Sequence, residues 1–165
     1  YQGEGNFNYS ATFLIDPGSD NDKAVRKAIQ KAAENGWLKK AEETLKSIVS
    51  QPMKFCYIDG NTKSYDGYAG KWALSAKRPK KSGPPKVVDL DPTVVIGPEE
   101  GRPYGGCYVN AKVQLWAQVK GKGAPGMRCS LVSVQWKADG DQFGGAPVSN
   151  TEGFEVEEDE GSDLY

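Results

Sequence analysis

The stretch GCYVNAKVQLWAQVK, residues 106–120, alternates in character along its whole length. One set of alternate positions holds Cys107, Val109, Ala111, Val113, Leu115, Ala117 and Val119, and the other holds Tyr108, Asn110, Lys112, Gln114, Trp116, Gln118 and Lys120. Successive side chains of a strand point to opposite faces, so this pattern predicts a long strand with a core face and a wet, aromatic face. A second run, MRCSLVSVQW (127–136), follows the loop GKGAPG, so residues 106–136 are predicted to form a long antiparallel hairpin.

The rest of the chain is predicted to add shorter strands and one helical insertion. The predicted strands are 7–15, 54–58, 68–76, 87–90 and 93–96, and the predicted helices are 19–36 and 37–49, with Asn35-Gly36 as the stop of the first helix. The fold is therefore expected to be mainly β (α+β), with a helical insertion at about residues 20–50 after the first strand. One domain is expected over residues 1–150.

Several enzyme classes are excluded by what the sequence lacks. There is no histidine, so His-based general bases and nucleophile pairs are absent, and there is no GxxxxGK[ST] phosphate loop. The segment 121–126 matches GxGxxG, but it precedes a strand rather than a helix and contains Pro125, which indicates a hairpin turn. Paired carboxylates lie beside Pro and Gly in predicted loops, where solvated turns are the simpler interpretation. We expect no catalysis, no cofactor and no metal.

The three cysteines, Cys56, Cys107 and Cys129, are odd in number, far apart and without a CxxC pair. This pattern favours neither a disulfide framework nor a zinc site, so a reducing intracellular location is expected. No apolar run approaches the roughly 18 residues of a membrane helix, and no membrane partner is expected.

Charge divides the chain into two unlike parts. Residues 151–165 hold seven acidic residues and no Lys or Arg, which predicts a disordered acidic tail. Residues 1–150 keep all 21 basic residues against 15 acidic ones, a net charge of +6. Between residues 67 and 88 there are six basic residues and no acidic ones, which would attract anions.

Aromatic residues are interleaved with this basic stretch and with the wet face of the long strand. Proteins that bind single strands combine a cationic groove for phosphates with aromatic faces for bases. The candidate nucleic-acid-binding residues are Lys71, Trp72, Lys77, Arg78, Lys80, Lys81, Tyr104, Tyr108, Lys112, Trp116, Lys120, Lys122 and Arg128. Burial beneath the helices is the competing interpretation for any single aromatic side chain. An RNA-binding module and a protein-interaction surface remain open as alternatives.

The segments YDGYAG (65–70), AKRP (76–79), GGCYVNA (105–111) and GMRCSLVSVQWKADGDQFGG (126–145) resemble a family of bacteriophage single-stranded DNA-binding proteins, formerly catalogued as a domain of unknown function. The resemblance extends over nearly the whole body. It implies a five-stranded oligonucleotide-binding (OB) barrel that coats DNA during phage replication or recombination in the host cell cytoplasm, without catalysis. Members usually carry a further strand upstream of the segment matching Tyr1, so the edge of the barrel is expected to differ here.

The resemblance also bears on the tail, because other replication proteins that bind single strands carry acidic tails. The tail could occupy the basic groove and then recruit replication proteins, through Glu157, Glu158, Asp159, Glu160, Asp163, Leu164 and Tyr165. A tail that only confers solubility is the simpler alternative.

Overall fold

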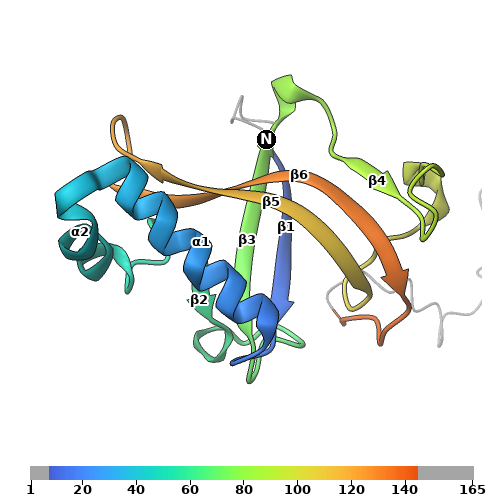
Figure 1. Ribbon diagram of the computed structural model, residues 1–165. Coiled ribbons are helices and arrows are strands. Elements are labelled where there is room, and N and C mark those ends of the chain that lie inside the picture. The colour runs from blue at the N-terminus through green and yellow to red at the C-terminus, as the bar shows by residue number, and fades with distance from the viewer. Residues whose placement is uncertain (1–7, 145–165) are drawn as a thin grey trace, which may run out of the picture.

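In a computed structural model, which describes residues 8–144, two helices and six strands follow one another in the expected order (Figure 1). The elements are β1 (Asn8–Ile15), α1 (Asp20–Trp37), η1 (Leu38–Lys40), α2 (Ala41–Ile48), β2 (Tyr57–Asp59), η2 (Gly60–Thr62), β3 (Trp72–Pro79), η3 (Lys80–Ser82), β4 (Lys86–Val88), η4 (Pro98–Glu100), β5 (Tyr108–Gln118) and β6 (Gly126–Ala138). The mainly β class, the helical insertion after the first strand and the long hairpin are confirmed.

The sheet is built around β6. β5 pairs antiparallel with β6 over its whole length, while β3 and β4 pair parallel with the other edge of β6. β1 and β2 both pair antiparallel with β3. In Figure 1, β1 and β3 run across the direction of β5 and β6, so the sheet is strongly bent. It is an open sheet of six strands, and within residues 8–144 no strand pairing joins β1 to β5.

Helix α1 covers the inner face of this bent sheet, where the core lies. Its side chains Ile29 and Ala33 pack with Leu74 of β3 and Leu131 of β6 in one hydrophobic cluster. The helix begins after Ser19, whose hydroxyl accepts a hydrogen bond from the Asp22 N–H.

The first helix runs one residue past its predicted stop, and Gly36 explains why. A Cβ at Gly36 would lie 2.5 Å from the Cβ of Ala117 on β5. Glycine is therefore needed inside the helix for a close approach to the sheet, rather than after its end. The second predicted helix is also shorter than expected, because η1 precedes α2.

The predicted strand at 93–96 is wrong. Val95 makes only an isolated bridge with Val88, and Val94 and Val95 are exposed. Asp91 accepts hydrogen bonds from the N–H and hydroxyl of Thr93, which fold this segment into a turn. Only Ile96 of the four residues is buried.

A buried polar network fixes the start of α1 to β2. The Asp22 side chain is 7% exposed and accepts hydrogen bonds from the Gly18 N–H (2.8 Å), the Tyr57 hydroxyl (2.7 Å) and Arg26 Nε (2.9 Å). The bonds from Gly18 and Tyr57 hold the pKa of Asp22 below its usual value. The Arg26 guanidinium also lies 4.5 Å from the centre of the Trp72 ring, so the network extends to β3.

The three cysteines are free thiols. Burial raises the pKa of both Cys56 and Cys129 to about 12, so these two thiols are poor nucleophiles. Within residues 8–144 no cluster of three or more potential ligands could hold a metal ion, and no helix there is long and apolar enough to cross a membrane.

Candidate nucleic-acid interface

The face of the sheet opposite α1 is here called the outer face. On each strand, the alternate side chains that point to this face are mostly polar. One row of paired residues crosses four strands, because Ser10 pairs with Lys77, Lys77 with Ser130, and Ser130 with Gln114. Paired residues point to the same side of a sheet. The row therefore forms a continuous polar surface from β1 to β5.

The charge of this region has a single sign. The four strands β1, β3, β5 and β6 contain no Asp or Glu. Their basic residues are Lys77, Arg78, Lys112, Arg128 and Lys137. An anionic polymer lying on these strands would meet cations without any repelling carboxylate.

Two exposed aromatic side chains lie on the outer side of β5. Trp116 is 42% exposed, and its indole N–H donates to Ser130 Oγ at 3.0 Å, which ties the ring to β6. Tyr108 is 62% exposed at the other end of the strand. At about 3.3 Å per residue, the two side chains are separated by roughly 26 Å, with Lys112 midway between them. This spacing offers stacking surfaces at both ends of a cationic strand.

Eight of the predicted site residues lie on this face or at its borders. Lys77, Tyr108, Lys112 and Trp116 project from the strands, Lys120 and Lys122 lie in the turn between β5 and β6, and Lys80 and Lys81 lie in η3, directly after β3. All eight are exposed. The structure thus brings together two segments whose nearest members, Lys81 and Tyr108, are 27 residues apart in the sequence.

Trp72 and Lys71 make contacts within the fold. Trp72 has the same strand parity as Leu74 and packs on the inner face, where its ring centre is 5.4 Å from that of Tyr57. Lys71 forms an ion pair with Asp16, in the loop after β1. Trp72 therefore lies off the outer face, whereas the charge of Lys71, directly before β3, is neutralised by Asp16.

The two predicted arginines are occupied by backbone contacts. Arg78 donates from Nε to the Gly83 carbonyl (2.8 Å) and from Nη2 to the Ser82 carbonyl (2.8 Å). Arg128 donates from Nη1 to the Met53 carbonyl (2.8 Å) and from Nε to the Gln118 side chain (2.9 Å). Both charges contribute to the local field, but both side chains primarily hold loops in place.

Tyr104 is also engaged within the fold. Its hydroxyl lies 2.9 Å from both Asp139 Oδ1 and the Gly140 carbonyl, and accepts from the Gly140 N–H at 3.1 Å. Its ring centre lies 5.8 Å from that of Trp136, which is buried. This half-buried side chain orders the segment after β6.

Lys137 is an exposed basic residue of β6 that the sequence-based prediction missed. The register between β5 and β6 shifts twice, so that Val132 and Lys137 have no paired residue on β5. If side chains are assigned to alternate faces of β6 from Arg128 onward, Lys137 is therefore placed on the wrong face. The absence of acidic residues from both hairpin strands could have indicated that Lys137 belongs to the same basic surface.

The predicted tail residues, from Glu157 to Tyr165, lie outside the described residues.

Comparison with known proteins identifies the relatives of this fold. The sequence profile of the Enterobacter phage Enc34 ssDNA-binding protein family matches residues 1–165. The chain belongs to this family. Protein p50 of Acyrthosiphon pisum secondary endosymbiont phage 1 is 38% identical over 156 residues, which cover 93% of this chain and 81% of p50.

Solved structures of the Enc34 protein are similar to this chain. The single-stranded DNA-binding protein from bacteriophage Enc34 matches with a TM-score of 0.66 and 24% identity, over 90% of this chain and 78% of that chain. The same protein in complex with ssDNA matches with a TM-score of 0.64 and 28% identity, over 87% of this chain and 80% of that one. These matches confirm the family predicted from the sequence.

Proposed function

We propose that this chain binds single-stranded DNA without sequence preference along the outer face, and coats phage DNA during replication or recombination. The observation that carries the proposal is the acid-free outer face, with Trp116, Lys112 and Tyr108 in succession along β5. Membership of the ssDNA-binding family and the 28% identity to a protein solved with ssDNA support it.

Phosphates and bases would make different contacts. Lys77 and Lys112 on the strands, with Lys120 and Lys122 in the turn, would neutralise phosphates, and the released counterions would supply affinity. Trp116 and Tyr108 would stack on bases, and every base has a face to stack on, so binding tolerates any sequence. We infer no catalytic role.

We further propose that the open sheet is an OB-type barrel with one strand position left unfilled. In the order β1, β3, β6, β5, only the pair β3–β6 is parallel. β1 and β5 therefore run in the same direction, and one strand antiparallel to both would complete a five-stranded barrel. The packing of α1 against β5 and the inner face supports a core that is covered without that strand.

The remaining assignments complete this proposal. Residues 1–150 would form the DNA-binding domain, which acts in the host cell cytoplasm. Residues 151–165 would form a separate acidic tail that competes with DNA for the outer face and recruits replication proteins. The net charge of +6 on residues 1–150, against seven acids in the tail, supports such competition.

Tryptophan fluorescence during titration with a thymidine oligonucleotide tests the site. Trp116→Ala should weaken binding by about 1–3 kcal/mol, the contribution of one stacked base. Trp116→Phe should retain most of the affinity. If about four phosphates are neutralised, log K should fall against log salt with a slope near roughly −3, and Lys112→Gln should make that slope shallower by about 0.7.

The matched control is Lys46→Gln, which removes the same charge from α2, where Lys46 pairs with Glu42 instead of facing the sheet. Equal effects of Lys112→Gln and Lys46→Gln would contradict the assignment of the outer face. Competition with an RNA of the same sequence separates the DNA-binding from the RNA-binding role. Absence of any salt-sensitive binding would instead indicate a protein interface.

A further inference from the structure

The two ends of the molecule each expose a cluster of apolar side chains. The first, here called the helical end, comprises Leu38, Val49, Met53 and Val119, near the junction of the helices and the turn between β5 and β6. The second, here called the arm, spans residues 89–102 and exposes Leu90, Val94 and Val95. Figure 1 shows α2 and the β5–β6 turn on the left, and β4 with the segment that follows it on the right. The two clusters cannot meet within one molecule.

Contacts with β5 and β6 hold the helical end together. Gly36, two residues before Leu38, lies against Ala117 of β5. The Met53 carbonyl accepts a hydrogen bond from Arg128 at the start of β6. Met53 is 84% exposed and Leu38 is 71% exposed. Apolar side chains gathered at one end of a molecule in this way mark an interaction surface.

Leu38 adds an independent observation, because its backbone is strained. It follows α1 with φ 53° and ψ −122°, and it is the only non-glycine residue with positive φ among residues 8–144. Glycine usually occupies such a position at the end of a helix. A large exposed side chain kept in this conformation points to a function outside the monomer.

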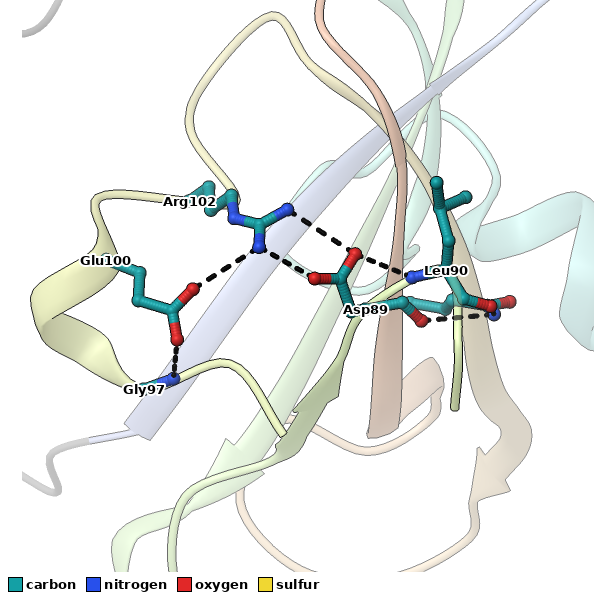
Figure 2. A network of polar contacts seen from close by, with 6 residues as sticks. Asp89, Leu90, Gly97, Glu100 and Arg102 are labelled. Atoms are coloured by element: carbon teal, nitrogen blue, oxygen red, sulfur yellow. Dashed lines mark hydrogen bonds and ion pairs between the residues drawn. The ribbon is translucent and has the colours of Figure 1, made fainter. Parts of the chain in front are cut away.

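The arm is held rigid by the polar network in Figure 2. Arg102 binds Asp89 at 2.7 Å and Glu100 at 3.3 Å, and the Glu100 carboxylate accepts from the Gly97 N–H at 3.3 Å. The hydrogen bonds from Arg102 and from the Leu90 N–H also hold the pKa of Asp89 below its usual value.

Two further contacts fix the arm to β6. Gln135 donates its side-chain amide to the Leu90 carbonyl at 3.1 Å. The Arg102 guanidinium lies 5.4 Å from the centre of the Trp136 ring. The exposed apolar side chains of the arm are thus held by an ordered segment, so that little conformational entropy is lost when the arm binds a partner.

The charges around the two clusters are opposite in sign. The helical end is bordered by four exposed lysines, Lys39, Lys40, Lys120 and Lys122, against the exposed Glu42 and Glu43 of α2, so its net charge is positive. The arm carries Asp91 and Glu99, which make no ion pair within residues 8–144, while its Arg102 is taken up by Asp89 and Glu100. Opposite potentials at two apolar surfaces favour their association and set its direction.

We propose that the arm of one molecule packs on the helical end of a second copy of the same chain. Such a head-to-tail contact uses different surfaces on the two partners, so it does not close and it generates a linear array. The outer side of β5 runs from the helical end toward the arm. Successive molecules in the array would therefore line up their outer faces along one DNA strand, and this step rests on the proposed function.

The contact is small, so it acts between molecules already bound to DNA. Each cluster exposes only a few side chains, well below the area of a stable protein interface. Neighbours on one DNA strand, however, meet at an effective concentration in the millimolar range. Binding to a long strand is then cooperative, while the free protein is monomeric.

Charge reversal tests the contact without touching the DNA-binding residues. Lys39→Glu with Lys40→Glu places two acidic side chains next to Glu42 and Glu43, so the α2 side of the helical end becomes acidic while Lys120 and Lys122 are left unchanged for DNA. Asp91→Lys with Glu99→Lys makes the arm basic. Each double variant repels its own copies, so each should keep its affinity for an oligonucleotide of one site within about twofold. Cooperativity on poly(dT) should fall by about tenfold or more. A 1:1 mixture of the two variants restores opposite charges at every contact and should recover cooperativity.

The matched control is Lys23→Glu with Lys27→Glu on the exposed side of α1, which should leave cooperativity unchanged. Cooperativity that survives in either test variant, or that the mixture fails to recover, overturns the proposal. The proposal is also overturned if removal of residues 151–165 abolishes cooperativity while the arm variants retain it. In that case the acidic tail, and not the arm, binds the helical end. If the wild-type protein binds the short oligonucleotide but shows no cooperativity on poly(dT), the contact between copies is refuted and the proposed function is not. Failure to bind the short oligonucleotide refutes the proposed function.

Discussion

Replacing Asp22 by alanine should destabilise the protein by about 2–3 kcal/mol. The buried Tyr57 hydroxyl would lose its acceptor, which costs roughly 1–3 kcal/mol. The ion pair with Arg26 adds less than about 1 kcal/mol, because that side chain is 50% exposed and regains water. The Gly18 N–H lies in an exposed turn and is rehydrated. For a chain of this size the melting temperature should fall by roughly 5–10 °C.

The pH dependence of this effect has a definite sign. The pKa of Asp22 in the folded state lies below that of an unfolded aspartate, about 3.9. The stabilisation by the charged form is therefore complete above about pH 4 and is lost as the pH falls through the folded pKa. The difference in stability between wild type and Asp22→Ala should be large at pH 7 and should shrink toward pH 3.

Denaturant unfolding monitored by tryptophan fluorescence at several pH values measures both quantities. Tyr57→Phe in the Asp22→Ala background is the control, because phenylalanine leaves no hydroxyl without an acceptor. The double variant should be no less stable than Asp22→Ala alone. An Asp22→Ala protein within about 0.5 kcal/mol of wild type at pH 7 would refute the buried network as a source of stability, given the usual scatter of surface substitutions.

Two further substitutions test the packing of α1 and the sign of the outer face. Gly36→Ala should destabilise the protein by roughly 1–3 kcal/mol, because the added Cβ would clash with Ala117, although helix propensity alone predicts a gain of about 1 kcal/mol. Ala117→Gly in the same protein should relieve this clash. Thermal unfolding shows whether the change in stability is a loss or a gain. Gln114→Glu adds one charge to the outer face and should weaken ssDNA binding about fivefold at low salt, an effect that should vanish near 1 M salt. Asn21→Asp, the same change on α1, should leave affinity unchanged, and equal losses would contradict the binding face.

The β5–β6 hairpin was predictable because a period of two over 15 residues fixes both the element and its faces. The exposed outer positions of Trp116 and Tyr108 followed from that alternation. The inner positions are only half-buried, and Ala111 and Val119 are exposed, because β5 is an edge strand covered by a single helix. Alternation thus predicts the direction of a side chain, whereas burial depends on tertiary neighbours that the sequence of one strand does not specify.

The structure separates the predicted site residues where the prediction used proximity in sequence instead of strand parity. Trp72 was assigned to DNA because it adjoins the basic stretch, yet it shares parity with Leu74 and Ala76, which are core residues. Arg78 has that same parity, and its guanidinium turns to backbone carbonyls. Writing out the alternation of β3 would have separated both from Lys77. The two register shifts along β6 could not be inferred in this way, because nothing in the sequence marks the extra residues.

The distribution of charge among the elements carries an argument that no single residue does. The whole chain has 22 acidic residues in 165, so its four longest strands, about 40 residues together, would hold about five at that frequency. Low strand propensity lowers this expectation but does not account for complete absence, because exposed edge positions tolerate acids well. A surface selected only for solubility mixes both signs. Exclusion of carboxylates from these four strands, with acids retained on β2, the helices, the loops and the tail, is what a surface that holds a polyanion requires.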